Sequence, residues 1–124
     1  MRDEETITEG ALEINRSQTD DALVLSFSGK SIVRDPAEFL QPLLLGALSE
    51  AEEAGIRLLL DFRGLTYMNS STFTPLIKVL EKARLGDQAV IVWYDSEQKW
   101  QEVSFAALKI FATKDQRIRI TAAE

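Results

Sequence analysis

The chain has 124 residues, of which 45% are hydrophobic and 27% are charged, a balance typical of one globular domain with a single core. It contains no cysteine and no histidine, which excludes disulfides, thiolate zinc sites, cysteine nucleophiles and the commonest general base. The formal net charge is -6, and basic residues occur singly, so a nucleic-acid partner would be repelled. We therefore expect no nucleic-acid binding, no metal, no cofactor and no catalytic residue.

The first ten residues are polar and acidic, with little to bury, and are expected to form a flexible N-terminal tail or a weak leading strand. The domain itself is expected over residues 11–124. The start of the chain lacks the apolar stretch of a signal peptide, and the run Leu43–Leu45 is far too short to span a bilayer. These features favour a cytoplasmic protein without membrane association.

Two strands are predicted at the start of the domain. Leu12 and Ile14 alternate with polar residues, and residues 22–27 form a more apolar run. The short polar connection over residues 17–21 predicts an antiparallel hairpin, and Gly29 marks the end of the second strand.

A helix is predicted from Asp35 and Pro36 to about Ala54. Asp35 is a candidate N-cap, proline is favoured at the first helical position, and Glu38 completes a capping box. Gly55 is a typical C-terminal stop. Spacings of three and four place one apolar face against the core, formed by Phe39, Leu40, Leu43, Leu44, Ala47, Leu48 and Ala51.

The unbroken apolar run over residues 56–62 predicts a central strand, followed by a turn at Arg63 and Gly64. A second helix is predicted over about residues 71–85, and Pro75 restricts its start to residues 70–72 because proline is tolerated in a first turn. Its predicted inward residues are Phe73, Leu76, Ile77, Leu80 and Ala83.

The remaining elements are a strand over 89–93, a helix over about 96–111 and an edge strand over 117–121. Trp93 is expected in the core rather than as an exposed binding aromatic. Helices between successive strands imply right-handed crossovers, so we predict an α/β fold. The expected architecture is one domain with a mixed, largely parallel sheet of about five strands and helices packed against it.

The stretch over residues 58–80 carries a specific pattern. An apolar strand, Leu58 to Leu60, ends in Asp61; Tyr67 and Met68 precede the tetrad Asn69-Ser70-Ser71-Thr72, and an amphipathic helix follows. This stretch resembles the signature of STAS domains, in which an Asp-Ser-Ser/Thr-Gly motif joins such a strand to such a helix. The resemblance implies a single STAS-like domain. Asn69 replaces the usual Asp, and Thr72 replaces the usual Gly.

The resemblance is to the anti-sigma-factor antagonists, which are non-enzymatic switches. It implies phosphorylation at Ser70 by a partner that is both a serine kinase of the histidine-kinase-like ATPase class and an anti-sigma factor, and reversal by a cognate phosphatase. Ser71 and Thr72 are secondary candidates for phosphorylation. The implied partner-binding residues are Gly29, Lys30, Ser31, Arg34, Asn69, Ser71 and Thr72.

A second resemblance points to another partner. The segments Gly29-Lys30-Ser31, Tyr67-Met68-Asn69-Ser70-Ser71 and Val92-Trp93-Tyr94-Asp95, with Phe39 and Pro42, are similar to small regulatory phosphoproteins that bind and activate a diguanylate cyclase. That family carries Asn at the position of Asn69. It implies a phosphorylation-controlled cyclase activator.

Three other interpretations stay open at this point. Ser70, Ser71 and Thr72 would simply cap a helix in a STAS scaffold that is never phosphorylated. Lys30 and Arg34 would pair with a phosphate or be solvated charges. A serine enzyme would use Ser70 with Asp61 or a lysine as its base, but the Gly-x-Ser-x-Gly motif of a nucleophile elbow is absent.

Overall fold

The structure is a computed structural model that describes residues 4–32, 34–35 and 38–122. Within these ranges no helix is long and apolar enough to cross a bilayer. In chain order the elements are β1 (Glu4–Glu9), β2 (Leu12–Gln18), β3 (Ala22–Ser31), α1 (Leu40–Ala54), β4 (Arg57–Met68), α2 (Ser70–Leu85), β5 (Val90–Tyr94), α3 (Lys99–Ala106), the 3-10 helix η1 (Ala107–Phe111) and β6 (Ile118–Ala122).

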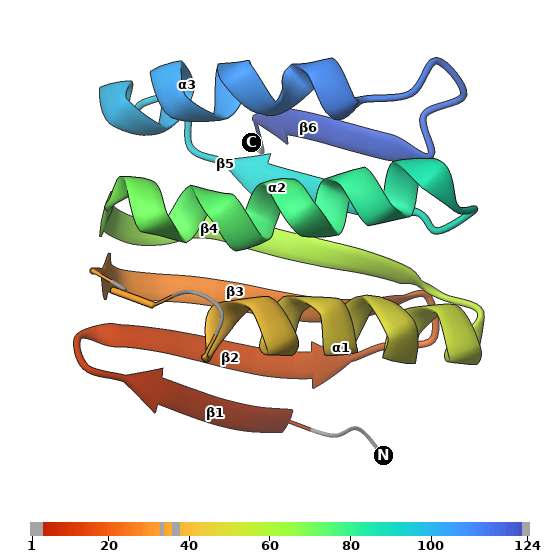
Figure 1. The fold of residues 1–124 in the computed structure, drawn as a ribbon, viewed down its shortest axis with the longest axis horizontal. Coiled ribbons are helices and arrows are strands. Elements are labelled where there is room, and N and C mark those ends of the chain that lie inside the picture. Colours follow the sequence, from red (N-terminus) through yellow and green to blue (C-terminus); the bar gives the residue numbers. More distant parts are fainter. Residues whose placement is uncertain (1–3, 33, 36–37, 123–124) are drawn as a thin grey trace.

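The strands form one sheet in the order β1-β2-β3-β4-β5-β6. β1, β2 and β3 pair antiparallel, whereas β3, β4, β5 and β6 pair parallel. Three successive right-handed crossovers that step in the same direction place all their helices on one face. Figure 1 shows this arrangement, with α1, α2 and α3 on the near side of the sheet. The prediction of one α/β unit with a mixed, largely parallel sheet is confirmed, and β6 lies at an edge as expected.

The sixth strand is β1, which lies in the segment expected to be a flexible tail or a weak leading strand. Glu4–Glu9 pairs along its whole length with β2, and Ile7 lies opposite Ile14. The two strands are joined through Gly10, which adopts a φ of 60°. Backbone pairing and one apolar contact therefore outweigh the acidic composition of this segment, and the sheet has one strand more than predicted.

Helix α1 begins later than predicted. Its N-cap is Phe39, which makes no side-chain cap bond, and the Glu38 N–H instead donates to the Asp35 carbonyl in a turn before the helix. Pro36 lies outside the described residues. The predicted stop is confirmed, because Gly55 has a φ of 72° and caps the carbonyls at the C-terminus of α1. Burial of its apolar face, rather than a capping box, fixes where α1 starts.

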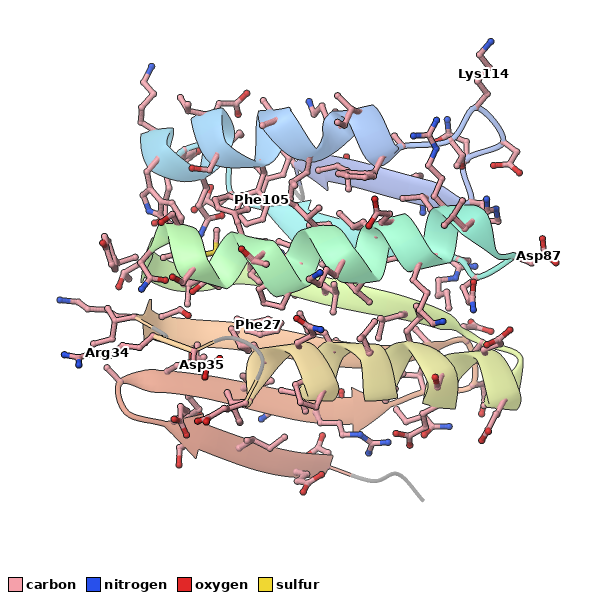
Figure 2. The ribbon with its side chains drawn as sticks, viewed as in Figure 1. Phe27, Arg34, Asp35, Asp87, Phe105 and Lys114 are labelled. Atoms are coloured by element: carbon pink, nitrogen blue, oxygen red, sulfur yellow. The ribbon has the colours of Figure 1, made fainter. Side chains whose placement is uncertain are left out.

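The core lies between the sheet and the helices. Phe105 of α3 is fully buried at its centre and contacts three rings, with centroid distances of 5.1 Å to Phe62, 5.7 Å to Tyr94 and 6.0 Å to Phe73. Phe27 of β3 stacks on Phe62 with a centroid distance of 4.4 Å. Figure 2 labels Phe27 and Phe105. Aromatic packing thus joins α2 and α3 to the middle of the sheet.

Two predicted core positions are wrong. Tyr94 is buried in the core, whereas Trp93, the residue before it, is half-buried on the opposite face of the sheet. Successive strand residues face opposite sides, so only one of them could join the core. The second is Ile77 on α2, which is 38% exposed, whereas Val79 is fully buried. The apolar face of the helix that packs on the sheet includes Val79 and not Ile77.

Candidate functional site

Strand β4 leads directly to the predicted site, and its pairing with β3 is irregular. It continues to Met68, beyond the turn predicted at Arg63 and Gly64. β4 gains one residue over β3 between Asp61 and Gly64, and another between Leu65 and Tyr67. The residues buried on the core side are therefore spaced by three, at Phe62, Leu65 and Met68, instead of by two. This spacing explains why the two-residue spacing of inward-facing apolar residues in the sequence ends at Phe62.

Two glutamines at the start of α3 hold the irregular part of β4. The fully buried Gln101 side chain donates from Nε2 to the carbonyls of Phe62 (2.7 Å) and Leu65 (2.8 Å), and its Oε1 accepts from the Asp95 N–H (2.8 Å). Gln98 Nε2 donates to the Arg63 carbonyl at 3.0 Å. These bonds satisfy carbonyls of the irregular stretch and fix the path of β4 toward Ser70.

A chain of hydroxyl and amide groups joins β3 to the start of α2. The Asn69 side-chain oxygen accepts from the Thr72 N–H (3.2 Å) and from the Thr72 hydroxyl (2.8 Å). The Ser31 and Thr72 hydroxyl oxygens are 2.6 Å apart. Because the single Thr72 hydroxyl proton goes to Asn69, Ser31 must donate to Thr72. Asn69 is thus the N-cap of α2, and Ser31 and Thr72 anchor it to the sheet.

The N-cap gives a first prediction. Replacing Asn69 with alanine removes the acceptor for two donors, and we expect the free energy of unfolding to fall by about 1–2 kcal/mol. Asn69→Asp should stay within about 0.5 kcal/mol of the parent, because a carboxylate accepts both bonds and is favoured at a helix N-terminus. Urea unfolding followed by circular dichroism measures both. Equal losses for the two variants would contradict the capping role.

Ser70 is the first residue of α2 and its side chain is exposed. Three exposed apolar residues lie on the segments that meet at the start of α2: Tyr67 precedes Ser70 by three residues (49% exposed), Ile77 lies seven residues along the same helix, and Ile32 follows Ser31 (60% exposed). Lys30 pairs with Tyr67 across β3 and β4. We call Lys30, Ile32, Tyr67, Ser70 and Ile77 the Ser70 surface. An exposed hydroxyl within such a group is accessible to a protein partner.

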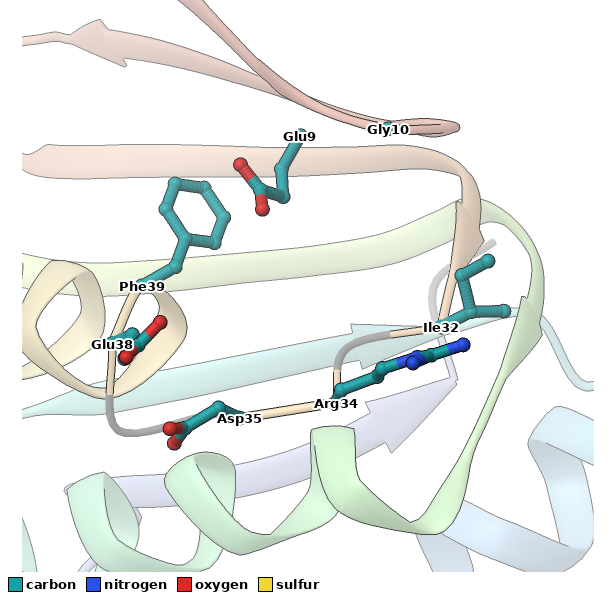
Figure 3. A pocket seen from close by; sticks show the side chains of 7 residues that line it. All are labelled: Glu9, Gly10, Ile32, Arg34, Asp35, Glu38 and Phe39. Atoms are coloured by element: carbon teal, nitrogen blue, oxygen red, sulfur yellow. The ribbon is translucent and has the colours of Figure 1, made fainter.

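A cavity of about 360 Å³ adjoins the Ser70 surface through Ile32 (Figure 3). It lies between the turn from β1 to β2 and the connection from β3 to α1, and its lining includes Arg34, Asp35, Glu38 and Glu9. Arg34 is exposed, so its charge is available at the edge of the surface.

Burial changes the predicted set of partner-binding residues. Ser31 is 1% exposed and Thr72 is 5% exposed, so neither can contact a partner, and the Thr72 hydroxyl is inaccessible to a kinase. Both position the loop instead. Lys30 and Arg34 are exposed, and Asn69 and Ser71 are half-buried.

Gly29 also has a structural role. It adopts a φ of 85°, and a Cβ atom on it would lie 2.1 Å from the Ala11 carbonyl oxygen. The next residue, Lys30, donates its N–H to that same carbonyl at 3.0 Å.

Sequence reasoning missed Ile32 as a surface residue and Gln101 as a buried residue that holds β4, because neither belongs to a recognisable motif.

Catalysis by Ser70 with Asp61 as its base conflicts with the geometry. The Asp61 carboxylate lies on the face of the sheet opposite the helices, where Oδ1 accepts from Arg63 Nε (2.9 Å) and Oδ2 accepts from Arg63 Nη2 (2.8 Å). This pairing raises the pKa of Arg63 above its usual value.

Among residues 4–32, 34–35 and 38–122, no group of three or more acidic side chains could hold a metal ion.

Comparison with known proteins supports the fold. No protein-family model and no curated protein sequence matches the chain. The crystal structure of an anti-sigma factor antagonist from Mycobacterium paratuberculosis matches with a TM-score of 0.62 and 17% sequence identity, over 89% of this chain and 93% of that one. The chain therefore has a STAS-like fold.

Proposed function

We propose that this protein is a regulatory switch of the anti-sigma-factor-antagonist kind, which binds a protein partner through the Ser70 surface and is released by phosphorylation of Ser70. The observation that carries the proposal is that Ser70 is exposed at the start of α2, and that Ile32, Tyr67 and Ile77, on the segments that meet there, are exposed as well. The STAS-like fold, shared with an anti-sigma factor antagonist, supports the class of partner.

The position of Ser70 suits both states of such a switch. The first turn of α2 has backbone N–H groups without intrahelical acceptors, and these favour a phosphate on the free protein. In a complex, the same phosphate adds about -1.5 to -2 charges amid apolar side chains. Burial of a charge without a partner costs several kcal/mol, and each 1.4 kcal/mol weakens binding about tenfold. Phosphorylation is therefore expected to release the partner.

The proposed partner is an anti-sigma factor that is also a serine kinase of the histidine-kinase-like ATPase class, opposed by a cognate phosphatase. The first test is intact mass after incubation with this kinase and ATP. We expect one added phosphate on the parent protein and on Ser71→Ala, which is the matched control, and none on Ser70→Ala. A phosphate retained in Ser70→Ala would refute the assignment.

The second test measures affinity for the same anti-sigma factor by calorimetry. Ser70→Ala should bind within about threefold of the parent, whereas Ser70→Asp should bind at least about a hundredfold more weakly, because its carboxylate is buried against apolar groups. Tyr67→Ala should also weaken binding if the Ser70 surface is the interface. Equal affinities for all four proteins would contradict the proposed release mechanism.

A diguanylate cyclase is the alternative partner. The motif Asn69-Ser70-Ser71 favours it, because the cyclase-binding family carries Asn at the position of Asn69, where anti-sigma-factor antagonists usually carry Asp. The two partners are separated by one experiment, which adds the protein to a purified cyclase and measures synthesis of the cyclic dinucleotide. Activation that is lost in Ser70→Asp would identify the cyclase activator. A constitutive scaffold would bind its partner equally well with alanine or aspartate at position 70.

A further inference from the structure

The face of the sheet that carries no helix has an ordered arrangement of side chains. Cross-strand register and two-residue alternation place two rows across all six strands on this face. The first row is Glu4, Ser17, Val24, Leu59, Ile91 and Arg119, and the second is Thr6, Asn15, Ser26, Asp61, Trp93 and Thr121. Together with Glu13 and Arg57, we call these residues the helix-free face. Figure 1 views the sheet from its other side.

The centre of the helix-free face is apolar. Leu59 is 9% exposed and Ile91 is 6% exposed, yet neither belongs to the core between the sheet and the helices. Val24 lies beside Leu59 on β3, and Trp93 lies one row away on β5. The middle of an otherwise polar face is thus apolar, and its accessible part is formed mainly by the half-buried side chains of Val24 and Trp93.

The charges of this face are segregated between its two sides. Glu4 and Glu13 lie on β1 and β2, whereas Arg57 and Arg119 lie on β4 and β6. None of these four takes part in an ion pair within the described residues, and Arg119 Nε is buried without a hydrogen-bond partner there.

A fifth and a sixth charge near the centre already neutralise each other. Asp61 pairs with Arg63, whose guanidinium also lies 4.8 Å above the Trp93 ring. The charged side chains of this face without an ion pair among the described residues are therefore acidic on β1 and β2 and basic on β4 and β6.

We propose that the helix-free face binds a second copy of this chain. A two-fold axis parallel to the strands, between β3 and β4, lays β1 of each protomer over β6 of the other. The first row of one protomer then lies over the first row of the other, with the order of the strands reversed. Val24 lies over Leu59 of the second copy, and Glu4 lies opposite its Arg119. Near the axis an apolar side chain therefore meets an apolar one, and at each side of the dimer an unpaired acidic side chain meets an unpaired basic one.

The size of the face fits a weak dimer. Six strands spaced by about 4.8 Å and five residues long cover roughly 500 Å² per protomer, so the dimer would bury roughly 1,000 Å² in total. This area is near the lower limit for a specific interface, and we expect dissociation at micromolar concentrations. The Ser70 surface lies on the α2 side and stays exposed, so the dimer does not depend on the proposed switch. Both Ser70 residues lie at the same end of it, because the axis runs parallel to the strands.

The test is sedimentation equilibrium of the full chain over a wide concentration range. We expect a monomer–dimer equilibrium that weakens with added salt, because screening weakens the pairs between Glu4 and Arg119. Each of Glu4→Arg and Arg119→Glu should weaken association at least tenfold, since each places like charges opposite one another. The double variant carrying both changes should restore it.

The matched control is Glu53→Arg, which reverses an exposed charge on α1, away from the helix-free face, and should leave the equilibrium unchanged. Circular dichroism confirms that each variant is folded. A chain that stays monomeric at every concentration would overturn the proposal and leave the face to a different partner. So would a dimer that ignores both charge reversals, or a double variant that remains as weak as the single ones.

Discussion

Replacing Gly29 with alanine is expected to lower the free energy of unfolding by more than about 3 kcal/mol. A φ of 85° costs an L-residue about 1–2 kcal/mol. The added methyl group would also lie 2.1 Å from the Ala11 carbonyl oxygen. Backbone atoms must move to relieve that overlap, and the bond from Lys30 to the same carbonyl would be strained. Denaturant unfolding at equilibrium measures the loss.

Gly55→Ala is the matched control for Gly29→Ala. Gly55 has a similar φ of 72°, but a Cβ atom added to it would have no atom within 4 Å apart from those of Gly55 itself and its chain neighbours. It should therefore cost only the conformational strain, about 1 kcal/mol. If the two substitutions lower the free energy of unfolding by the same amount, the close approach of Ala11 to Gly29 adds nothing to the cost of Gly29→Ala. The backbones at Ala11 and Gly29 would then be farther apart than the overlap implies.

The second large effect is expected from Gln101→Met, which keeps the length of the side chain and removes all of its hydrogen bonds. The carbonyls of Phe62 and Leu65 and the N–H of Asp95 would lose a buried partner. Each unsatisfied buried group costs about 1–3 kcal/mol, so we expect a loss of about 3 kcal/mol or more. The irregular part of β4 would lose its clamp, and hydrogen exchange should increase between Phe62 and Met68.

Two variants on the same segment calibrate this result. Gln98→Met removes two bonds of a half-buried side chain, the one donated to the Arg63 carbonyl and the one accepted from Trp100 Nε1, and its cost should be about 1 kcal/mol. Lys99→Met changes an exposed residue and should be neutral within about 0.5 kcal/mol. A loss for Gln101→Met no greater than that for Gln98→Met would show that its three bonds are not the source of stability.

The order of elements could be predicted because their periodicities are regular. Apolar residues spaced by three and four identify α1 and α2, and an unbroken apolar run identifies the first half of β4. Prediction failed where tertiary contacts override the local pattern. β1 is acidic but gains a full set of backbone bonds from β2, and the start of α1 is set by burial rather than by the capping signal at Asp35.

The candidate site was only partly predictable for a similar reason. The motif around Ser70 stands out in the sequence, but burial is a property of the folded chain. Ser31 belongs to the same motif as Lys30 and points into the protein, where it donates to Thr72. Gln101 is distant in sequence and reaches β4 only after α3 packs on the sheet. No local pattern distinguishes such a buried amide from a solvated one.

The irregular path of β4 makes the stretch from Phe62 to Met68 sensitive to length rather than to composition. Because β4 has two more residues than β3 over this stretch, deleting Gly64 alone would remove one of the two bulges, and Leu65 and Met68 would still face the core. The carbonyls of Phe62 and Leu65 would then be two residues apart instead of three, so the Gln101 side chain could not bridge them in its present geometry, and the path of β4 toward Ser70 would change. Related chains that keep this site should therefore vary freely in residue type here while keeping the same number of residues.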